Sequence, residues 1–322
     1  MESEEETMEA LEEITRVEFP KLGWGPWEWD RYLVRDLFGN LSIAWYGVII
    51  CLGIILAGFV ILKNAKKKEG FKTDSFLDYF LISIPLSVVG ARLMYVLTSL
   101  KEYHSFADVF KVWEGGLAFY GGLIFGVIAV FVTSRVKKDP FFKVADAIIP
   151  GVILAQAIGR WGNFINGEAH GTKTDLPWGM MINEDGPFHP TFFYEILVTF
   201  SGFILLQFIL YRKKKFDGEL LCVYMTWYGV GRTFVEGLRT DSLPLGPLRI
   251  SQVIGVASAV AGVVLFFLLY AGAKKAVPAE GSDIKTEETA EETKETAPSA
   301  NEAALDDTDD DKRENAENGN DH

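Results

Sequence analysis

Residues 41–62 decide the fold class: they read LSIAWYGVIICLGIILAGFVIL and contain no charged side chain. A helix needs about 20 consecutive apolar residues to cross the hydrocarbon core of a bilayer. Further apolar stretches of similar length follow along the chain, at residues 76–98, 116–134, 141–159, 191–211, 219–237 and 250–270. The sequence therefore predicts an all-α, polytopic membrane protein with about seven transmembrane helices.

The composition agrees with this interpretation. Of the 322 residues, 49% are hydrophobic and 13% are aromatic, and the mean hydropathy is +0.15. The net charge of −13 does not describe the apolar body, because most of the acidic excess lies in residues 2–13 and after Pro278. The charge therefore gives no reason to expect a nucleic-acid partner.

Cysteine and histidine give no sign of a metal or redox centre. Cys51 and Cys222 are the two cysteines of the chain, and both lie inside apolar stretches. This pattern predicts neither a disulfide framework nor a CxxC metal site. His170 and His189 are too few, and too far from paired acids, to suggest a metal ligand set. We expect no metal and no cofactor.

Basic residues alternate between the loops and predict the orientation. Clusters of Lys and Arg follow the first, third, fifth and seventh apolar stretches, and the loops between them hold few clustered basic residues. These clusters are Lys63 to Lys72, Arg135 to Lys138, Arg212 to Lys215, and Lys274 with Lys275. Basic loops remain in the cytoplasm. The N-terminus is therefore expected outside the cytoplasm and the C-terminus inside.

The sequence divides into three regions. Residues 1–40 form an acidic start, not a cleavable signal peptide, followed by an arm whose tryptophans suit the outer membrane interface. Residues 41–270 are expected to form a seven-helix membrane domain with an extracytoplasmic loop at residues 161–190. Residues 271–322 form an acidic cytoplasmic tail that is expected to be disordered.

The polar side chains that are unfavourable to insert into a membrane lie at one membrane depth. An arginine near the centre of a membrane helix costs about 2.5–3.5 kcal/mol on insertion scales, so such residues usually face a cavity and serve a function. With the predicted orientation, the polar residues lie towards the outer helix ends: Tyr46, Arg92, Tyr120, Arg160, Glu195, Arg232 and Glu236. Two structural alternatives stay open. Arg92 could extend to the outer headgroups, and Arg232 with Glu236, one turn apart, could be a structural ion pair.

The most specific motif is Gly159 to Gly171, which reads GRWGNFINGEAHG. It resembles the signature GR-x-GNF-x-N-x-E-x-x-G of the prolipoprotein diacylglyceryl transferases. The resemblance covers roughly residues 19–270. Further matching stretches are Ala44 to Gly47 (AWYG), Gly90 to Arg92 (GAR), the Gly-Gly pairs of residues 116–134, His189 to Glu195 (HPTFFYE), and Tyr228-Gly229 through Arg232, Glu236 and Arg239.

The resemblance implies a function. Members of that family move the diacylglyceryl group of phosphatidylglycerol to the lipobox cysteine of exported prolipoproteins, the first step of lipoprotein maturation. It implies a seven-helix fold in the bacterial cytoplasmic membrane, with the site at the outer leaflet. The partners would be phosphatidylglycerol, prolipoprotein signal peptides with a lipobox cysteine, and membrane lipids.

Guanidinium groups suit a reaction that builds negative charge on a phosphate. We expect Arg160 to bind the lipid phosphate and Arg232 to stabilise the leaving group or the thiolate. Asn163, Asn166 and Glu168 would bind the glycerol headgroup or orient Arg160, and Tyr46 and Glu236 would hold the arginines. The expected catalytic residues are Arg232, Arg160 and Tyr120, and the expected substrate-binding residues are Arg160, Asn163, Asn166, Glu168, Tyr46, Glu236, Gly171 and Arg92.

Tyr120 departs from the family pattern. The family commonly has a histidine in an F-H-G-G-like stretch, where this chain reads Phe119-Tyr120-Gly121-Gly122. Whether Tyr120 replaces that histidine as a base or only binds the lipid stays open.

Other classes of function predict other patterns. The main alternative is a small-molecule or ion transporter, which would carry charged residues through the whole depth of its pathway. The inner halves of these apolar stretches hold almost no charged residues. An intramembrane protease would need a Gly-x-Ser-Gly stretch or paired membrane aspartates. A purely structural membrane protein would not need Arg160, Arg232 and the asparagines together.

Overall fold

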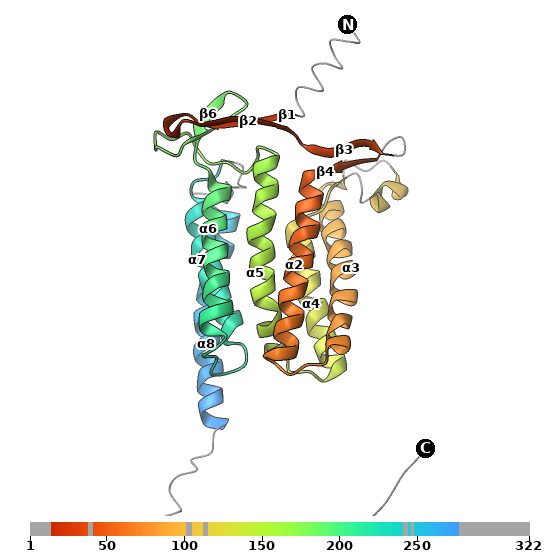
Figure 1. Ribbon diagram of the computed structural model, residues 1–322. Helices are drawn as coiled ribbons and strands as arrows, with labels where there is room; N and C mark the ends of the chain where they lie inside the picture. The colour runs from red at the N-terminus through yellow and green to blue at the C-terminus, as the bar shows by residue number, and fades with distance from the viewer. Residues whose placement is uncertain are drawn as a thin grey trace, which may run out of the picture. The chain divides into compact units, whose positions relative to one another are not determined.

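A computed structural model describes residues 14–37, 41–100, 105–111, 115–240, 244–245 and 248–276. The predicted acidic start and most of the predicted disordered tail lie outside these residues. Seven long helices run through the described part, and a π-helical turn, η5 (Leu205–Leu210), extends the fifth (Figure 1). They are α2 (Trp45–Lys67), α3 (Thr73–Thr98), α4 (Phe119–Lys137), α5 (Phe141–Ile165), α6 (Thr191–Ile204), α7 (Glu219–Glu236) and α8 (Ile250–Ala276).

Six of these helices, counting α6 with η5, are long and apolar enough to cross a membrane. The exception is α7, whose 18 residues include Glu219, Arg232 and Glu236. It packs against α5 and α6, so its charged side chains have protein partners. The prediction of a helical, multi-pass membrane protein is confirmed.

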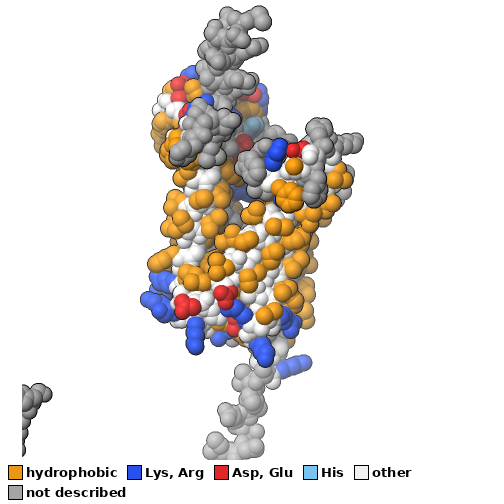
Figure 2. Space-filling view, turned by 90° about the vertical axis from the view of Figure 1, so that its right-hand side faces the viewer, with side chains coloured by type: hydrophobic (Ala, Val, Ile, Leu, Met, Phe, Trp, Pro, Cys, Tyr) orange, Lys and Arg blue, Asp and Glu red, His pale blue; other side chains and the backbone are white. Residues whose placement is uncertain are grey.

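Large apolar side chains cover the outside of the bundle. Phe59 on α2 is 68% exposed and Leu81 on α3 is 72% exposed. Figure 2 shows hydrophobic side chains in a broad band along the helices, with charged side chains at both ends of the band and most of the visible Lys and Arg at the lower end. A water-soluble protein rarely exposes so large an apolar surface. This band therefore suits contact with lipid.

The two ends of the bundle differ. The strands that Figure 1 labels lie at one end of the bundle, which we call the sheet end. The four basic clusters lie in or directly after the last turns of α2, α4, η5 and α8, at the opposite end of the bundle, which we call the lysine end. The four basic clusters of the sequence therefore lie on one side of the bundle.

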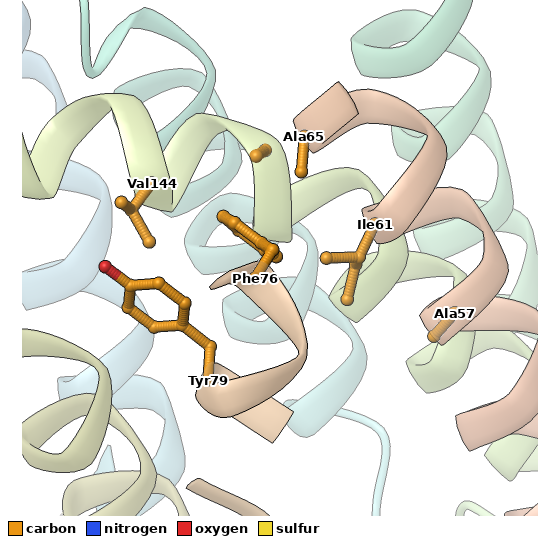
Figure 3. Close-up of a cluster of buried hydrophobic side chains, with 7 residues drawn as sticks. Ala57, Ile61, Ala65, Phe76, Tyr79 and Val144 are labelled. Atoms are coloured by element: carbon orange, nitrogen blue, oxygen red, sulfur yellow. The ribbon is translucent and has the colours of Figure 1, made fainter. Parts of the chain in front are cut away.

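A buried cluster near the lysine end joins three helices. Ala57, Ile61 and Ala65 of α2 meet Phe76 and Tyr79 of α3 and Val144 and Ala147 of α5 (Figure 3). The hydroxyl of Tyr79 donates to Asp139 Oδ2 at 2.8 Å, just before α5 begins. This packing fixes α5, which carries the GRWGNFINGEAHG motif at its other end.

The predicted interfacial arm and the loop 161–190 contain strands that the sequence analysis did not predict. An antiparallel sheet has the order β2-β1-β5-β6, and two short hairpins accompany it. The sheet strands are β1 (Ile14–Phe19), β2 (Trp24–Asp30), β5 (Met180–Ile182) and β6 (Asp185–Phe188). The hairpins are β3 (Tyr32–Leu37) with β4 (Leu41–Ala44), and β7 (Pro244–Leu245) with β8 (Leu248–Arg249). Short 3₁₀ turns are η1 (Pro20–Leu22) and η3 (Phe106–Phe110).

The fourth predicted helix was too short. The apolar stretch ends at residue 159, but α5 continues to Ile165, so Arg160 and Asn163 lie on its last turns. An apolar stretch shows which part of a helix lies in hydrocarbon, and residues 160–165 contain no proline that would end the helix at residue 159.

Candidate active site

Glu195 joins three helices at the sheet end. Near the start of α6, its side chain is buried, and its two carboxylate oxygens face guanidinium groups from different parts of the chain. Glu195 Oε2 lies 2.5 Å from Arg160 Nη2 on α5. Glu195 Oε1 lies 2.6 Å from Arg232 Nη1 on α7 and 3.2 Å from Arg239 Nη1 just after α7.

Glu236, the last residue of α7, supplies a second buried carboxylate. Its Oε2 lies 2.5 Å from Nη2 of Arg232, one helical turn earlier. The backbone oxygen of Glu236 accepts a hydrogen bond from Nη1 of Arg249, the last residue of β8, directly before α8. The ion pair of Arg232 with Glu236 therefore belongs to a larger network and does not stand alone.

We call Arg160, Arg232, Arg239, Arg249, Glu195 and Glu236 the arginine cluster. It holds four guanidinium groups and two carboxylates, so its formal charge is positive. The side chains of Arg160 and Arg232 are 24% and 17% exposed, whereas that of Glu195 is 4% exposed. The carboxylates thus lie on the protein side, and the more accessible face presents cationic donors, which suits an anionic ligand such as a phosphate.

The motif at the end of α5 forms a chain of hydrogen bonds that begins at the arginine cluster. Arg160 Nη1 donates to Asn163 Oδ1 at 3.2 Å. Asn163 Nδ2 then donates to Glu168 Oε1 at 3.1 Å, and Asn166 Nδ2 donates to the same oxygen at 3.3 Å. The structure therefore brings together four predicted site residues, Arg160, Asn163, Asn166 and Glu168, with Asn163 in direct contact with Arg160.

Tyr46 lies against the same motif. A Cβ atom added at Gly162 would lie 2.6 Å from Tyr46 Cδ2, so only glycine lets the tyrosine ring pack on this turn of α5. Tyr46 is the second residue of α2, at the sheet end. The contact explains a glycine of the motif and places Tyr46 against the turn of α5 that carries Asn163.

Gly171 links the loop 161–190 to the segment that carries Arg239. Its backbone forms an antiparallel bridge with Arg239, and Thr172 N donates to Leu238 O at 2.8 Å. An added Cβ would lie 2.8 Å from both the Leu238 carbonyl oxygen and His189 Cβ. Gly171 therefore permits a close backbone approach that fixes the position of Arg239, and we propose this in place of direct substrate contact.

Tyr120, the second residue of α4, faces the start of α8. Its hydroxyl lies 3.3 Å from Ser251 Oγ, and either atom can donate. The contact joins α4 to the helix that follows Arg249. Its hydroxyl thus meets a neutral hydroxyl group of α8.

Arg92 has a different environment from the arginine cluster. Its side chain is buried, and its guanidinium donates to the carbonyl oxygens of Asp108, Val109, Gly115 and Gly116 at 2.7, 2.9, 2.7 and 3.0 Å. The side chain therefore does not extend outward to headgroups, which was one alternative left by the sequence. Its partners lie in the segment between α3 and α4, so we propose that Arg92 shapes this segment.

Three members of the arginine cluster were not among the predicted site residues. Glu195 and Arg239 lie in stretches that matched the family, but their spacing alone did not reveal that they meet. Arg249 lies at a helix end and reads as an ordinary interfacial residue. The signal that pointed to Glu195 was its predicted membrane depth, since an acidic residue at the same depth as Arg160 and Arg232 needs a basic partner.

Among the described residues, no group of three or more His, Cys, Asp and Glu side chains could hold a metal ion. The side chains brought together at this site are guanidinium, carboxylate, amide and phenol groups.

Comparison with known proteins decides the family. The sequence pattern of the family described as prolipoprotein diacylglyceryl transferase matches residues 33–268. The chain belongs to this family. The matched residues run from β3 into α8 and include every residue of the arginine cluster.

Curated relatives agree with the family pattern. The phosphatidylglycerol–prolipoprotein diacylglyceryl transferase of Clostridioides difficile is 47% identical over 231 residues, which are 71% of this chain and 91% of that protein. Those of Finegoldia magna and Clostridium kluyveri are 46% and 42% identical and cover 71% and 74% of this chain. The matches cover 92% and 96% of those two relatives.

Proposed function

We propose that this protein transfers the diacylglyceryl group of phosphatidylglycerol to the lipobox cysteine of prolipoproteins, the first step of lipoprotein maturation. The observation that carries the proposal is the arginine cluster around Glu195, at one end of a membrane bundle. The names of the curated relatives supply the two substrates.

The reaction is a displacement at carbon. A cysteine thiolate attacks the glyceryl carbon that bears the phosphate ester, a sulfur–carbon bond forms, and the carbon–oxygen bond breaks. Glycerol phosphate leaves with the electron pair, and the thiol proton passes to solvent or to the leaving phosphate. Negative charge therefore grows on the phosphate oxygens, where fixed guanidinium donors stabilise the transition state most effectively.

The contacts suggest a role for each residue. We assign Arg160 to the lipid phosphate and Arg232 to the leaving group and the thiolate. Glu195 holds both side chains, with ion pairs of 2.5 and 2.6 Å, so they need not reorganise during the reaction. Asn163 orients Arg160, and Asn166 and Glu168 are available for the glycerol hydroxyl groups.

Activation of the thiol needs no separate base. A cysteine thiol with a pKa of about 8.5 costs only about 2 kcal/mol to ionise halfway at pH 7. A nearby opposite charge commonly shifts a pKa by about 1–3 units, so Arg232 can supply this stabilisation. Tyr120 then acts as a hydrogen-bond donor to the lipid phosphate or headgroup.

An apolar pocket beside the cluster supports a lipid substrate. It has a volume of about 590 Å³ and lies between α6, α7 and α8, lined by residues that include Val198, Trp227 and Gly231. Gly231 directly precedes Arg232, and Val198 lies three residues after Glu195. We assign the pocket to one acyl chain of the phosphatidylglycerol whose phosphate is bound by the arginines.

We place the sheet end outside the cytoplasm, at the outer leaflet of the bacterial cytoplasmic membrane. The four basic loops at the lysine end support this orientation. The test uses single cysteines in a Cys51→Ser, Cys222→Ser background. Thr174→Cys should react with an impermeant thiol reagent in intact cells, and Lys67→Cys and Lys138→Cys should not. Labelling of Lys138→Cys without permeabilisation would overturn the orientation.

The activity is tested with the purified full-length protein, vesicles that contain phosphatidylglycerol, and a peptide with a lipobox cysteine. The peptide should gain the mass of a diacylglyceryl group, and a peptide with serine in place of the cysteine should not. Vesicles of phosphatidylethanolamine alone serve as the headgroup control. Absence of transfer under every lipid condition would contradict the proposal and favour the transporter alternative.

A further inference from the structure

The β1–β2 hairpin lies before residue 33, where the match to the family begins. It nevertheless completes a sheet with β5 and β6, which belong to the loop between α5 and α6. In Figure 1 this sheet lies across the sheet end, above α5 and α6. Its inner face reaches the turn that carries the motif asparagines.

Strand β1 is docked on β5 through residues 16–18. Val17 pairs with Ile182, and Glu18 pairs with Met181. Arg16 O accepts a hydrogen bond from Asn183 N at 2.9 Å, and Arg16 N donates to Asn183 Oδ1 at 2.8 Å. Val17 is fully buried among Met180, Phe188 and other apolar side chains. The hairpin is therefore part of the apolar core at this end.

Trp29 on β2 holds the end of α5. Its indole Nε1 donates to the carbonyl oxygen of Ile165 at 2.8 Å, and its ring centroid lies 5.1 Å from that of Phe164. Ile165 is the last residue of α5, and the last carbonyl groups of a helix lack partners within the helix. Trp29 thus supplies a cap from a distant strand, between Asn163 and Asn166.

Thr15 on β1 fixes the next turn of the chain. Gly167 has a φ of +66°, and a Cβ added there would lie 3.0 Å from both Thr15 Cγ2 and Ile182 Cγ2. Thr15 is fully buried. The turn from Asn166 to Glu168 therefore packs closely against β1 and β5. Glu168, at the end of this turn, accepts the hydrogen bonds from Asn163 and Asn166.

We infer that the β1–β2 hairpin is a positioning element of the active site, with Trp29 as its main positioning residue. Trp29 and Thr15 hold the end of α5 and the following turn so that Asn163 keeps its hydrogen bond to Arg160. The inference rests on the proposed transferase activity. It adds to that activity a structural requirement that comes from residues before the family match.

The test measures kcat and KM for phosphatidylglycerol in purified variants of the full chain. Because a displacement of about 1 Å can cost about 100-fold in rate, Trp29→Ala should lower kcat by about 30-fold and leave KM within about 2-fold. Trp29→Phe keeps the ring but loses the N–H, and its kcat should fall by about 5-fold. Trp27→Ala is the matched control on the same strand, because Trp27 is 46% exposed, and its kcat should stay unchanged.

A double-mutant cycle separates positioning from a general structural effect. If Trp29 acts through Asn163, then Trp29→Phe and Asn163→Ala together should cost little more than Asn163→Ala alone. Additive losses, or a normal kcat in both Trp29 variants, would overturn the inference. If Trp29→Ala does not fold, the cycle with Trp29→Phe decides. A wild-type protein that shows no transfer at all would contradict the proposed function instead.

Discussion

Arg160 Nη2 lies 2.5 Å from Glu195 Oε2, so a buried carboxylate fixes one edge of the guanidinium plane. The other terminal nitrogen of Arg160 donates to Asn163. Taking an ion pair out of water costs desolvation free energy, and such pairs often contribute little net stability. We therefore explain the Arg160–Glu195 ion pair by the fixed geometry that it gives to the Arg160 guanidinium group, and not by a gain in folding stability.

Glu195→Gln tests this explanation. The amide keeps the size of the side chain but removes the negative charge among Arg160, Arg232 and Arg239, which then repel each other. We expect kcat/KM for transfer to fall about 100-fold, which corresponds to about 2.7 kcal/mol of transition-state stabilisation. Glu184→Gln, whose side chain is 75% exposed, is the matched control. Equal activity in the two variants would show that Glu195 does not organise the arginines.

Tyr120→Phe tests the role of the phenol. Keeping a phenolate at pH 7 would cost about 4 kcal/mol, so we expect a hydrogen-bond donor and not a base. The rate should fall about 10- to 100-fold, or about 1.4–2.7 kcal/mol, without being abolished. Tyr120→His should retain activity, and Ser251→Ala reports how much the contact with α8 contributes. Complete loss in Tyr120→Phe, with a wild-type rate that rises steeply up to about pH 10, would mark the phenolate as the base.

Arg92→Lys tests whether Arg92 supports the segment between α3 and α4. An ammonium group has three donors and cannot reproduce the planar fork that serves four carbonyl groups. A buried carbonyl left unpaired costs about 1–3 kcal/mol, so the unfolding temperature in lipid vesicles should fall. Arg35→Lys, at a half-exposed site on β3, is the control. An unchanged unfolding temperature with a raised KM for phosphatidylglycerol would show instead that Arg92 binds the lipid.

Lys214→Met tests the buried ion pairs at the lysine end. Lys214 Nζ lies 2.7 Å from Glu69 Oε1 and 3.2 Å from Asp146 Oδ2. Burial lowers the pKa of Lys214, but the hydrogen bond to Glu69 and the charge of Asp146 outweigh burial and raise it. This contribution to stability is therefore complete at neutral pH and is lost only as the pH rises through that raised pKa.

Removing one partner of a buried pair costs about 3–5 kcal/mol, so Lys214→Met should lower the unfolding temperature. Because the pair lies at the opposite end from the arginine cluster, kcat of the folded protein should stay near the wild-type value. Lys213→Met is the neighbouring control. A large fall in kcat without a fall in unfolding temperature would mean that the lysine end takes part in transfer.

The sequence predicts the membrane helices well because each is an apolar stretch of the right length. Their ends are harder to predict. The first predicted helix covers residues 41–62, whereas α2 begins at Trp45 and continues to Lys67. Hydropathy indicates which residues lie in the hydrocarbon, but the backbone hydrogen bonds decide where a helix begins and ends. The seven helices could be anticipated even so, α7 included, although its charged residues lower its hydropathy.

The site could be predicted in its residue types but not in its connections. Arg160, Asn163 and Glu168 lie within one motif, and local spacing placed them together. Glu195 was missed because it meets Arg160 and Arg232 only through the packing of α5, α6 and α7. The hairpin was missed for a similar reason, since β1 is short and its partner strand, β5, comes from the far side of four helices in the sequence.

The most direct test of the account follows both products in one reaction with wild-type protein, Arg160→Lys and Arg232→Lys. Mass spectrometry reports the lipidated peptide, and phosphorus NMR reports the glycerol phosphate released. The wild type should form them in equal amounts. Lysine keeps the charge but loses the planar fork, so both variants should insert normally and lose about 100-fold in rate. Near wild-type rates in both lysine variants would contradict the claim that the arginine cluster binds the phosphate through guanidinium geometry.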